Sequence, residues 1–171
     1  VTIGELGNTV DFGDLTVARQ ASAALSSSTR GVWGGGSTPS EGSGSVIIDF
    51  VTISTLGNAA DFGDLIDGIR REFCAASNST RGLFMGGSGP GENDTVQYIT
   101  IATQGNALDF GDLNNGFELG APGASPTRII HAGGTSPGSN VIDYFTISTL
   151  GNATDFGDRT VAGYGAGGCS N

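Results

Sequence analysis

Short apolar segments alternate along the chain with clusters of glycine, asparagine, aspartate and serine. This pattern predicts many short strands joined by turns, because these polar residues and glycine adopt turn conformations at low cost. In the second period the pattern predicts strands over 70–76, 81–85, 95–103 and 108–113. No segment combines a cap with an apolar stripe at helical spacing, so no helix is expected.

The same pattern returns along the whole chain. An element containing Thr-Ile, Gly-Asn and Asp-Phe-Gly-Asp begins at residues 1, 51, 99 and 145, in steps of 50, 48 and 46 residues. A second element, an arginine followed by a glycine doublet, repeats in phase with it. Four short strands in a period of this length are typical of one blade of a β-propeller.

The periods predict an all-β fold of kelch-like propeller type, with four-stranded blades. Complete blades are expected over 19–65, 70–113 and 117–158, with a partial blade over 1–15 and the start of another over 159–171. Propellers typically have about 4–8 blades. We therefore expect this array to be part of a larger propeller, completed by neighbouring repeats of a longer chain or by a second copy.

Several segments resemble the kelch family. Residues 81–87 and 128–134 resemble its second strand, residues 141–144 its third, and residues 16–19 the arginine-bearing segment that opens the next blade. An Asp-Phe-Gly-Asp element stands where the family usually has a tryptophan. The full repeat is similar to a kelch-like repeat of large structural proteins of marine cyanophages, and it also resembles some cyanobacterial proteins. This resemblance implies a virion structural protein.

The recurring residues are expected to be architectural. The glycines permit close backbone approach where blades crowd toward the axis, and the phenylalanines fill the core between blades. We expect each arginine to form an internal salt bridge with a repeated aspartate; the alternative is a surface that binds acidic sugars. The set comprises Gly35, Gly36, Gly86, Gly87, Gly133, Gly134, Arg30, Arg81, Arg128, Phe12, Phe62, Phe110 and Phe156.

Paired aspartates are candidates for a calcium site, because calcium prefers carboxylate and carbonyl oxygens. Two carboxylates are too few for the roughly 6–8 oxygens that calcium takes, so a turn-capping role is favoured. The pairs are Asp11 and Asp14, Asp61 and Asp64, Asp109 and Asp112, and Asp155 and Asp158.

Composition and charge narrow the possible partners. The chain has 17 acidic residues and 7 basic ones, all arginine, for a net charge of −10. Such a surface disfavours nucleic acid and anionic membranes, and no apolar run approaches the roughly 20 residues of a membrane span. One histidine and two cysteines are too few for a zinc cluster, so no metal or other cofactor is expected.

The single histidine and the cysteines are expected to be packing residues. His131 occupies a position that holds Trp33 and Phe84 in the other repeats, and no partner residues are placed for a catalytic triad. Cys74 and Cys169 lie two repeats apart, which disfavours a disulfide between them and favours buried thiols.

Variable loops follow each glycine doublet, and they are the weak candidates for binding. Their residues are Ser37, Glu41, Pro90, Glu92, Asn93, Ser136 and Asn140. The expected function is non-enzymatic: a virion protein of a phage tail, fibre or nozzle that presents loops for assembly or host attachment. The alternatives are a secreted or surface adhesin that binds glycans or proteins, and an enzyme of the kelch-like oxidase kind, which would need a metal. The expected location is a virion or the extracellular space.

Overall fold

Twelve strands form three four-stranded sheets in the computed structural model, which confirms the all-β, blade-like fold. The structure describes residues 8–38, 44–66, 71–89, 94–134 and 138–168. The strands of the first sheet are β1 (Ala23–Ser26), β2 (Arg30–Gly34), β3 (Ile47–Thr52) and β4 (Ala60–Asp64). Those of the second are β5 (Cys74–Ser77), β6 (Arg81–Met85), β7 (Thr95–Thr100) and β8 (Leu108–Asp112). Those of the third are β9 (Ala121–Ala124), β10 (Arg128–Ala132), β11 (Val141–Thr146) and β12 (Thr154–Asp158).

Each sheet is an antiparallel meander whose strands lie in chain order. The register repeats as well: Trp33 pairs with Asp49, Phe84 with Gln97, and His131 with Asp143. The pairing between the third and fourth strands shifts its register at the same place in every sheet, directly before Asp49, Gln97 and Asp143. The sequence repeat is therefore also a repeat of backbone geometry.

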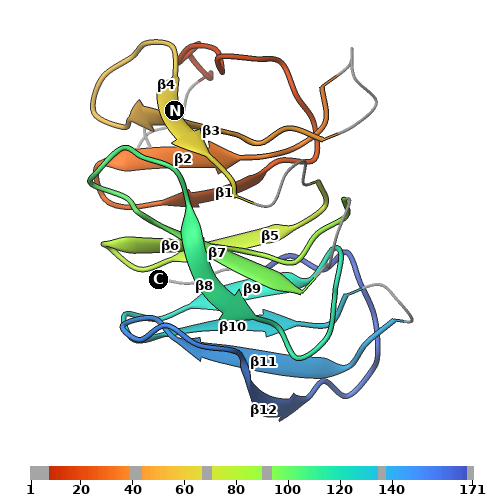
Figure 1. The fold of residues 1–171 in the computed structure, drawn as a ribbon. Coiled ribbons are helices and arrows are strands. Elements are labelled where there is room, and N and C mark those ends of the chain that lie inside the picture. The colour runs from red at the N-terminus through yellow and green to blue at the C-terminus, as the bar shows by residue number, and fades with distance from the viewer. Residues whose placement is uncertain (1–7, 39–43, 67–70, 90–93, 135–137, 169–171) are drawn as a thin grey trace.

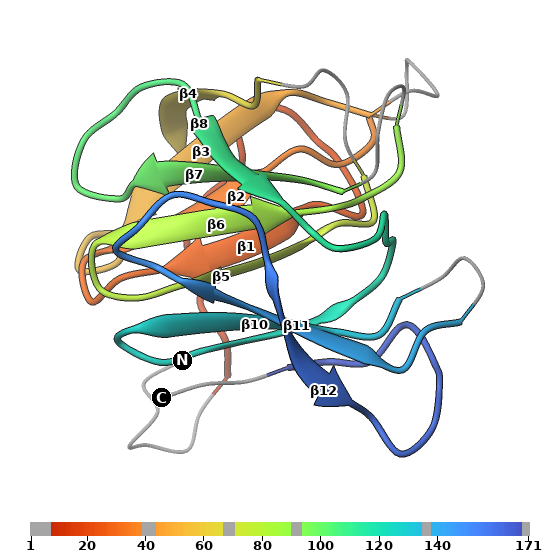
Figure 2. The same ribbon diagram turned by 60° about the horizontal axis from the view of Figure 1, so that its bottom comes forward.

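The three sheets pack face to face in succession, as Figure 1 shows from the first sheet at the top to the third at the bottom. Their first strands lie next to one another, with β5 between β1 and β9 (Figures 1 and 2). One apolar core fills the space between the first and second sheets, and a second core fills the space between the second and third. No helix in the described part of the chain is long and apolar enough to cross a bilayer.

Backbone hydrogen bonds link the segments that enter the first strands. The Glu72 amide donates to the Ala21 carbonyl, the Leu119 amide to the Glu72 carbonyl, and the Gly165 amide to the Leu119 carbonyl. All four residues have a positive φ, between 54° and 67°. The predicted strand over 70–76 therefore starts too early, because the chain turns at Glu72 and β5 begins only at Cys74.

A glycine doublet follows each second strand, and both of its residues have a positive φ. Gly86 and Gly87 have φ values of 65° and 100°. A Cβ on Gly87 would lie 2.5 Å from the Phe73 Cβ, and one on Gly36 would lie 2.7 Å from the Gln20 carbonyl oxygen. The doublet thus fits the close contact with the chain entering the first strand of the same sheet.

Candidate functional site

The connections between second and third strands leave the same end of all three sheets, because every sheet has the same strand order. At this end Ser37 is buried at 7 % exposure, and its backbone pairs with Gln20 and Gly44. Asn140 is exposed, and its carbonyl accepts a hydrogen bond from the Arg159 amide. Glu41, Pro90, Glu92, Asn93 and Ser136 lie outside the described residues.

A groove of about 580 Å³ runs along the first strands, at the opposite end of the sheets. Its lining consists of Gly168 and of alanine, leucine, serine, asparagine, proline and glycine residues of β1, β5, β9 and the turns after them, with no charged side chain. The Ser77 hydroxyl donates to the Ser26 carbonyl at 2.7 Å, and the Asn78 amide nitrogen donates to the Pro126 carbonyl at 3.0 Å. The groove can therefore offer small polar groups to a neutral ligand. Ser77 and Asn78 already use such groups for hydrogen bonds to a neighbouring sheet.

The junction between neighbouring sheets is the most regular feature of the molecule. The Gly105 amide donates to the Phe62 carbonyl and the Ala107 amide to the Asp64 carbonyl, both at 2.8 Å. The Asn106 Oδ1 atom accepts from the Asp64 amide at 3.1 Å. Residues 110–112 and 151–153 repeat these three bonds, and so do residues 12–14 and 57–59.

The glycine of Asp-Phe-Gly-Asp permits this junction. Gly63 has a φ of +145°, and a Cβ there would lie 2.4 Å from the Gly105 carbonyl oxygen. Gly13 and Gly111 have the same environment, with distances of 2.4 and 2.5 Å to the nearest atom. The turn of one sheet therefore lies directly on the outer strand of the sheet before it.

The first aspartate of each pair closes a local turn. The Asp11, Asp61, Asp109 and Asp155 carboxylates each accept a hydrogen bond from the amide two residues later, at 2.9–3.1 Å. Within the described ranges, no three histidine, cysteine, aspartate or glutamate side chains form a group that could hold a metal ion. The turn-capping role fits these contacts.

The repeated arginines bind carbonyl groups of the next sheet. Arg30 Nη1 donates to the Ile101 carbonyl and Arg81 Nη1 to the Ile147 carbonyl, each at 2.7 Å. Each guanidinium also lies over a ring of its own sheet, 4.6 Å from the Phe50 centroid for Arg30. The expected salt bridge to a repeated aspartate is wrong for these two residues: the one ion pair among the described residues is elsewhere.

Arg81→Ala is expected to lower the free energy of unfolding by about 1–3 kcal/mol, since it removes a charged hydrogen bond to the next sheet and a cation–π contact within its own sheet. Chemical denaturation measures the change. Arg128→Ala is the matched control, because Arg128 is exposed and the Tyr144 ring, at 4.6 Å, is the only described contact of its guanidinium. Equal losses in the two variants would contradict the junction role of Arg81.

A buried ion pair supports the first sheet. The Arg19 Nη2 atom lies 2.5 Å from Asp49 Oδ2, and both side chains are completely buried. The Thr16 hydroxyl donates to Asp49 Oδ1 at 2.6 Å. In the second sheet Gln97 takes the place of the aspartate and accepts from the Ile66 amide at 2.7 Å. A neutral acceptor therefore suffices at this position in that sheet.

His131 is buried at 1 % exposure and stacks on Phe117, with ring centroids 5.3 Å apart. Neither ring nitrogen has a hydrogen-bond partner among the described residues. Burial lowers the pKa of His131 from 6.5 to about 4. This environment fits the expected packing role and gives the position no described proton-transfer partner.

Because His131 binds its proton more weakly in the folded chain, stability should fall as the pH drops from about 6.5 toward 4. The loss at the acid end is up to about 3 kcal/mol. The variant His131→Phe carries the residue found at position 84 and should lack this part of the pH dependence. Denaturation of both proteins between pH 4 and 7 measures it, and parallel profiles would contradict the prediction.

Cys74 is a buried free thiol, and burial raises its pKa to about 12. Its sulfur contacts the Met85 carbonyl oxygen at 3.9 Å. The expected role of a buried thiol is therefore confirmed for Cys74, while Cys169 lies outside the described residues.

Sequence reasoning missed the asparagines at the junctions and the polar residues of the third strands. Asn58, Asn106 and Asn152 recur in a Gly-Asn dipeptide in every period, which was a visible signal. Asp49 and Asp143 hold the same place in the third strands, but no pattern in the sequence links Asp49 to Arg19, which lies 30 residues away.

No protein-family model fits this chain, and no curated protein is significantly similar to it. The repeated sequence and the repeated geometry of the junctions show an array of blade-like sheets.

Proposed function

We propose that the chain is a non-enzymatic structural and binding protein built from kelch-like propeller blades. It would serve as a virion component, in a phage tail, fibre or nozzle, and present loops for assembly or host attachment. One observation carries this proposal: three sheets of the same order and register send connections of different sequence from the same end. A constant scaffold with variable loops is a common way to present a binding surface.

The virion role is supported by the resemblance of the repeat to cyanophage structural proteins. The regular junctions also suit a protein that must hold its shape in a particle, since each junction combines an apolar core with backbone and asparagine hydrogen bonds. The expected partners are other virion proteins and neighbouring repeats of the same type.

The alternative function is a secreted or cell-surface adhesin. The groove along the first strands favours this alternative, because hydroxyl and amide groups without charge are suited to neutral sugars. The lining of this groove consists of small and uncharged side chains, so weak binding is the expected mode.

Purified particles from the source, analysed by quantitative mass spectrometry, would test the virion role. A constant ratio of this chain to the other particle proteins is the result expected. The purified chain should also be applied to a glycan array, beside a variant whose residues 88–94 are replaced by a glycine–serine segment of equal length. Glycan binding that this variant retains would point to the groove, and binding that it loses would point to the loops. Absence from particles together with glycan binding would favour the adhesin, and absence of both would contradict both functions.

A further inference from the structure

Among the described residues, one face of the first sheet is apolar and open, whereas the matching faces of the other two sheets are covered. A cavity of about 520 Å³ lies on it, lined by Trp33, Val51, Ile53 and Gly31 of the sheet and by residues 12–15. Ile53 is 45 % exposed, while Ile101 and Ile147 at the corresponding positions are 1 % and 3 % exposed.

The covered faces show which contacts complete such a surface. On the second sheet, Phe84, Ile99 and Ile101 form one core with apolar residues from all four strands of the first sheet and the adjoining segment: Ala23, Leu25, Val32, Ile48, Phe50, Phe62 and Leu65. A Cβ on Gly82 would lie 2.4 Å from Leu25, so this face accommodates side chains from the first strand of its neighbour. The same arrangement recurs between the second and third sheets.

The fourth-strand part of such a neighbouring unit already lies on the first sheet. Residues 12–14 lie on the first sheet as the fourth strands lie at the other junctions, with the Gly57 and Ala59 amides donating to the Phe12 and Asp14 carbonyls at 2.8 Å. They supply the contacts of an outer strand. The contacts that β1, β2 and β3 supply to the second sheet have no counterpart on the first sheet among the described residues.

We propose that this open face is the docking surface for a three-stranded unit of the same repeat, which would pair with residues 8–14 to complete a blade. The unit would place apolar side chains, at the positions of Leu25, Val32 and Ile48, over Trp33 and Ile53. Its arginine would donate to the Ile53 carbonyl, as Arg30 donates to the Ile101 carbonyl.

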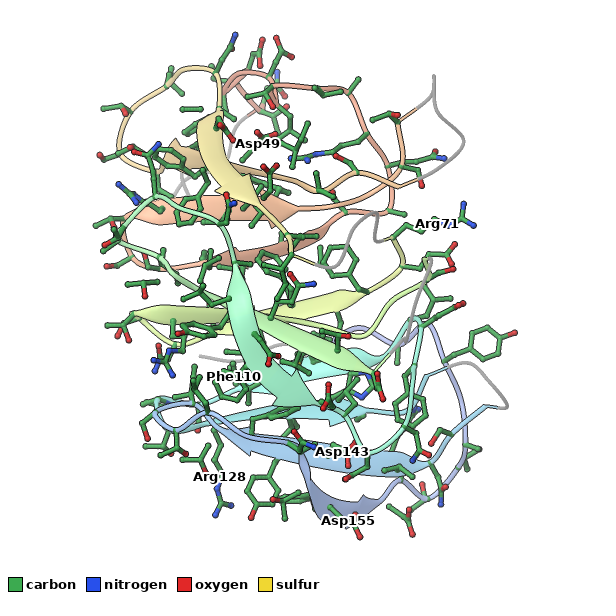
Figure 3. All side chains as sticks on the ribbon, viewed as in Figure 1. Asp49, Arg71, Phe110, Arg128, Asp143 and Asp155 are labelled. Atoms are coloured by element: carbon green, nitrogen blue, oxygen red, sulfur yellow. The ribbon has the colours of Figure 1, made fainter. Side chains whose placement is uncertain are left out.

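The third sheet shows the complementary half of the same interface in its open form. Phe156 is 57 % exposed, while Phe62 and Phe110 are 3 % and 2 % exposed. A Cβ on Gly157 would meet no atom within 4 Å, although its φ of +132° matches the glycines at covered junctions. Figure 3 shows Arg128 on the outer side of this sheet, away from the second sheet. Each sheet therefore carries two different faces, one for each neighbour in the array.

Fusion of a second copy of residues 16–50 directly before Val1 tests the proposal, because Val1 corresponds to Val51, which follows Phe50. The copy carries phenylalanine, the residue at position 84, in place of its tryptophan, so Trp33 remains the single tryptophan and its fluorescence on the open face reports docking. We expect the emission to shift to shorter wavelength and Tm to rise by more than about 4 °C. A control extension has serine in place of the copied Leu25, Val32 and Ile48, and should produce neither change.

A second variant tests the site itself. Ile53→Asp should change the unextended chain little, because Ile53 is partly exposed there, and it should abolish the gain from the extension. Unchanged Trp33 emission and Tm in the extended protein, with the extension still digested by protease, would overturn the proposal. The result does not depend on a virion or adhesive role, so the two proposals can fail separately.

Discussion

Replacing Phe110 with alanine is expected to lower the free energy of unfolding by about 3–5 kcal/mol, the usual cost of removing a buried aromatic side chain. Phe110 is 2 % exposed and makes edge-to-face contacts with Tyr98 and Phe145, at centroid distances of 5.9 and 5.7 Å. It lies between the second and third sheets (Figure 3). The variant therefore creates a cavity in the core of a junction, and urea denaturation measures the loss.

Phe156→Ala is the matched control for this prediction. Phe156 holds the same place in the repeat and has the same kind of ring contact, 6.1 Å from Tyr144, but it is 57 % exposed. Its loss should cost less than about 1 kcal/mol. Similar losses of stability in the two variants would contradict the claim that burial in the junction core sets the cost.

Asp49→Asn should lower the free energy of unfolding by about 3–5 kcal/mol, because it leaves the buried Arg19 guanidinium without its counter-ion. Burial lowers the pKa of Arg19, and the negative charge of Asp49 opposes that shift. Asp49 therefore stabilises the positive charge of Arg19 in the buried site. Thermal and urea denaturation at neutral pH measure the effect.

The double variant Arg19→Met with Asp49→Asn separates the ion pair from the rest of the site. It should recover most of the lost stability, since no buried charge remains and asparagine can still accept from Thr16. The second sheet carries the neutral Gln97 at this position. A double variant as unstable as Asp49→Asn alone would show that the arginine contributes through packing.

The sequence predicted the repeat and its four-stranded unit because each strand is short, apolar and followed by turn residues at fixed spacing. The strands over 81–85 and 108–113 match β6 and β8 to within one residue. The start of β5 was misplaced because Glu72 has a positive φ and its amide donates to Ala21, 51 residues earlier in the chain, which no local preference reports.

The hydrogen-bond partners of the arginines also could not be predicted from the sequence. Charge alone favours an aspartate, yet Arg30 and Arg81 end at carbonyl oxygens 71 and 66 residues away. The reason is geometric, because each arginine lies at the start of a second strand and faces the end of a third strand in the next sheet. A pattern of residue types does not carry that information.

Hydrogen exchange of the turn residues tests the central claim, that one repeated junction joins the blade-like sheets. Gly57, Gly105 and Gly151 are exposed residues in turns, where amides normally exchange rapidly. Their amides bind the Phe12, Phe62 and Phe110 carbonyls of the preceding unit. We therefore expect slow exchange at Gly105 and Gly151, comparable to the second strands and much slower than at Ala102 and Ser148, which are exposed residues of the same turns. Rapid exchange at both glycines would contradict the account.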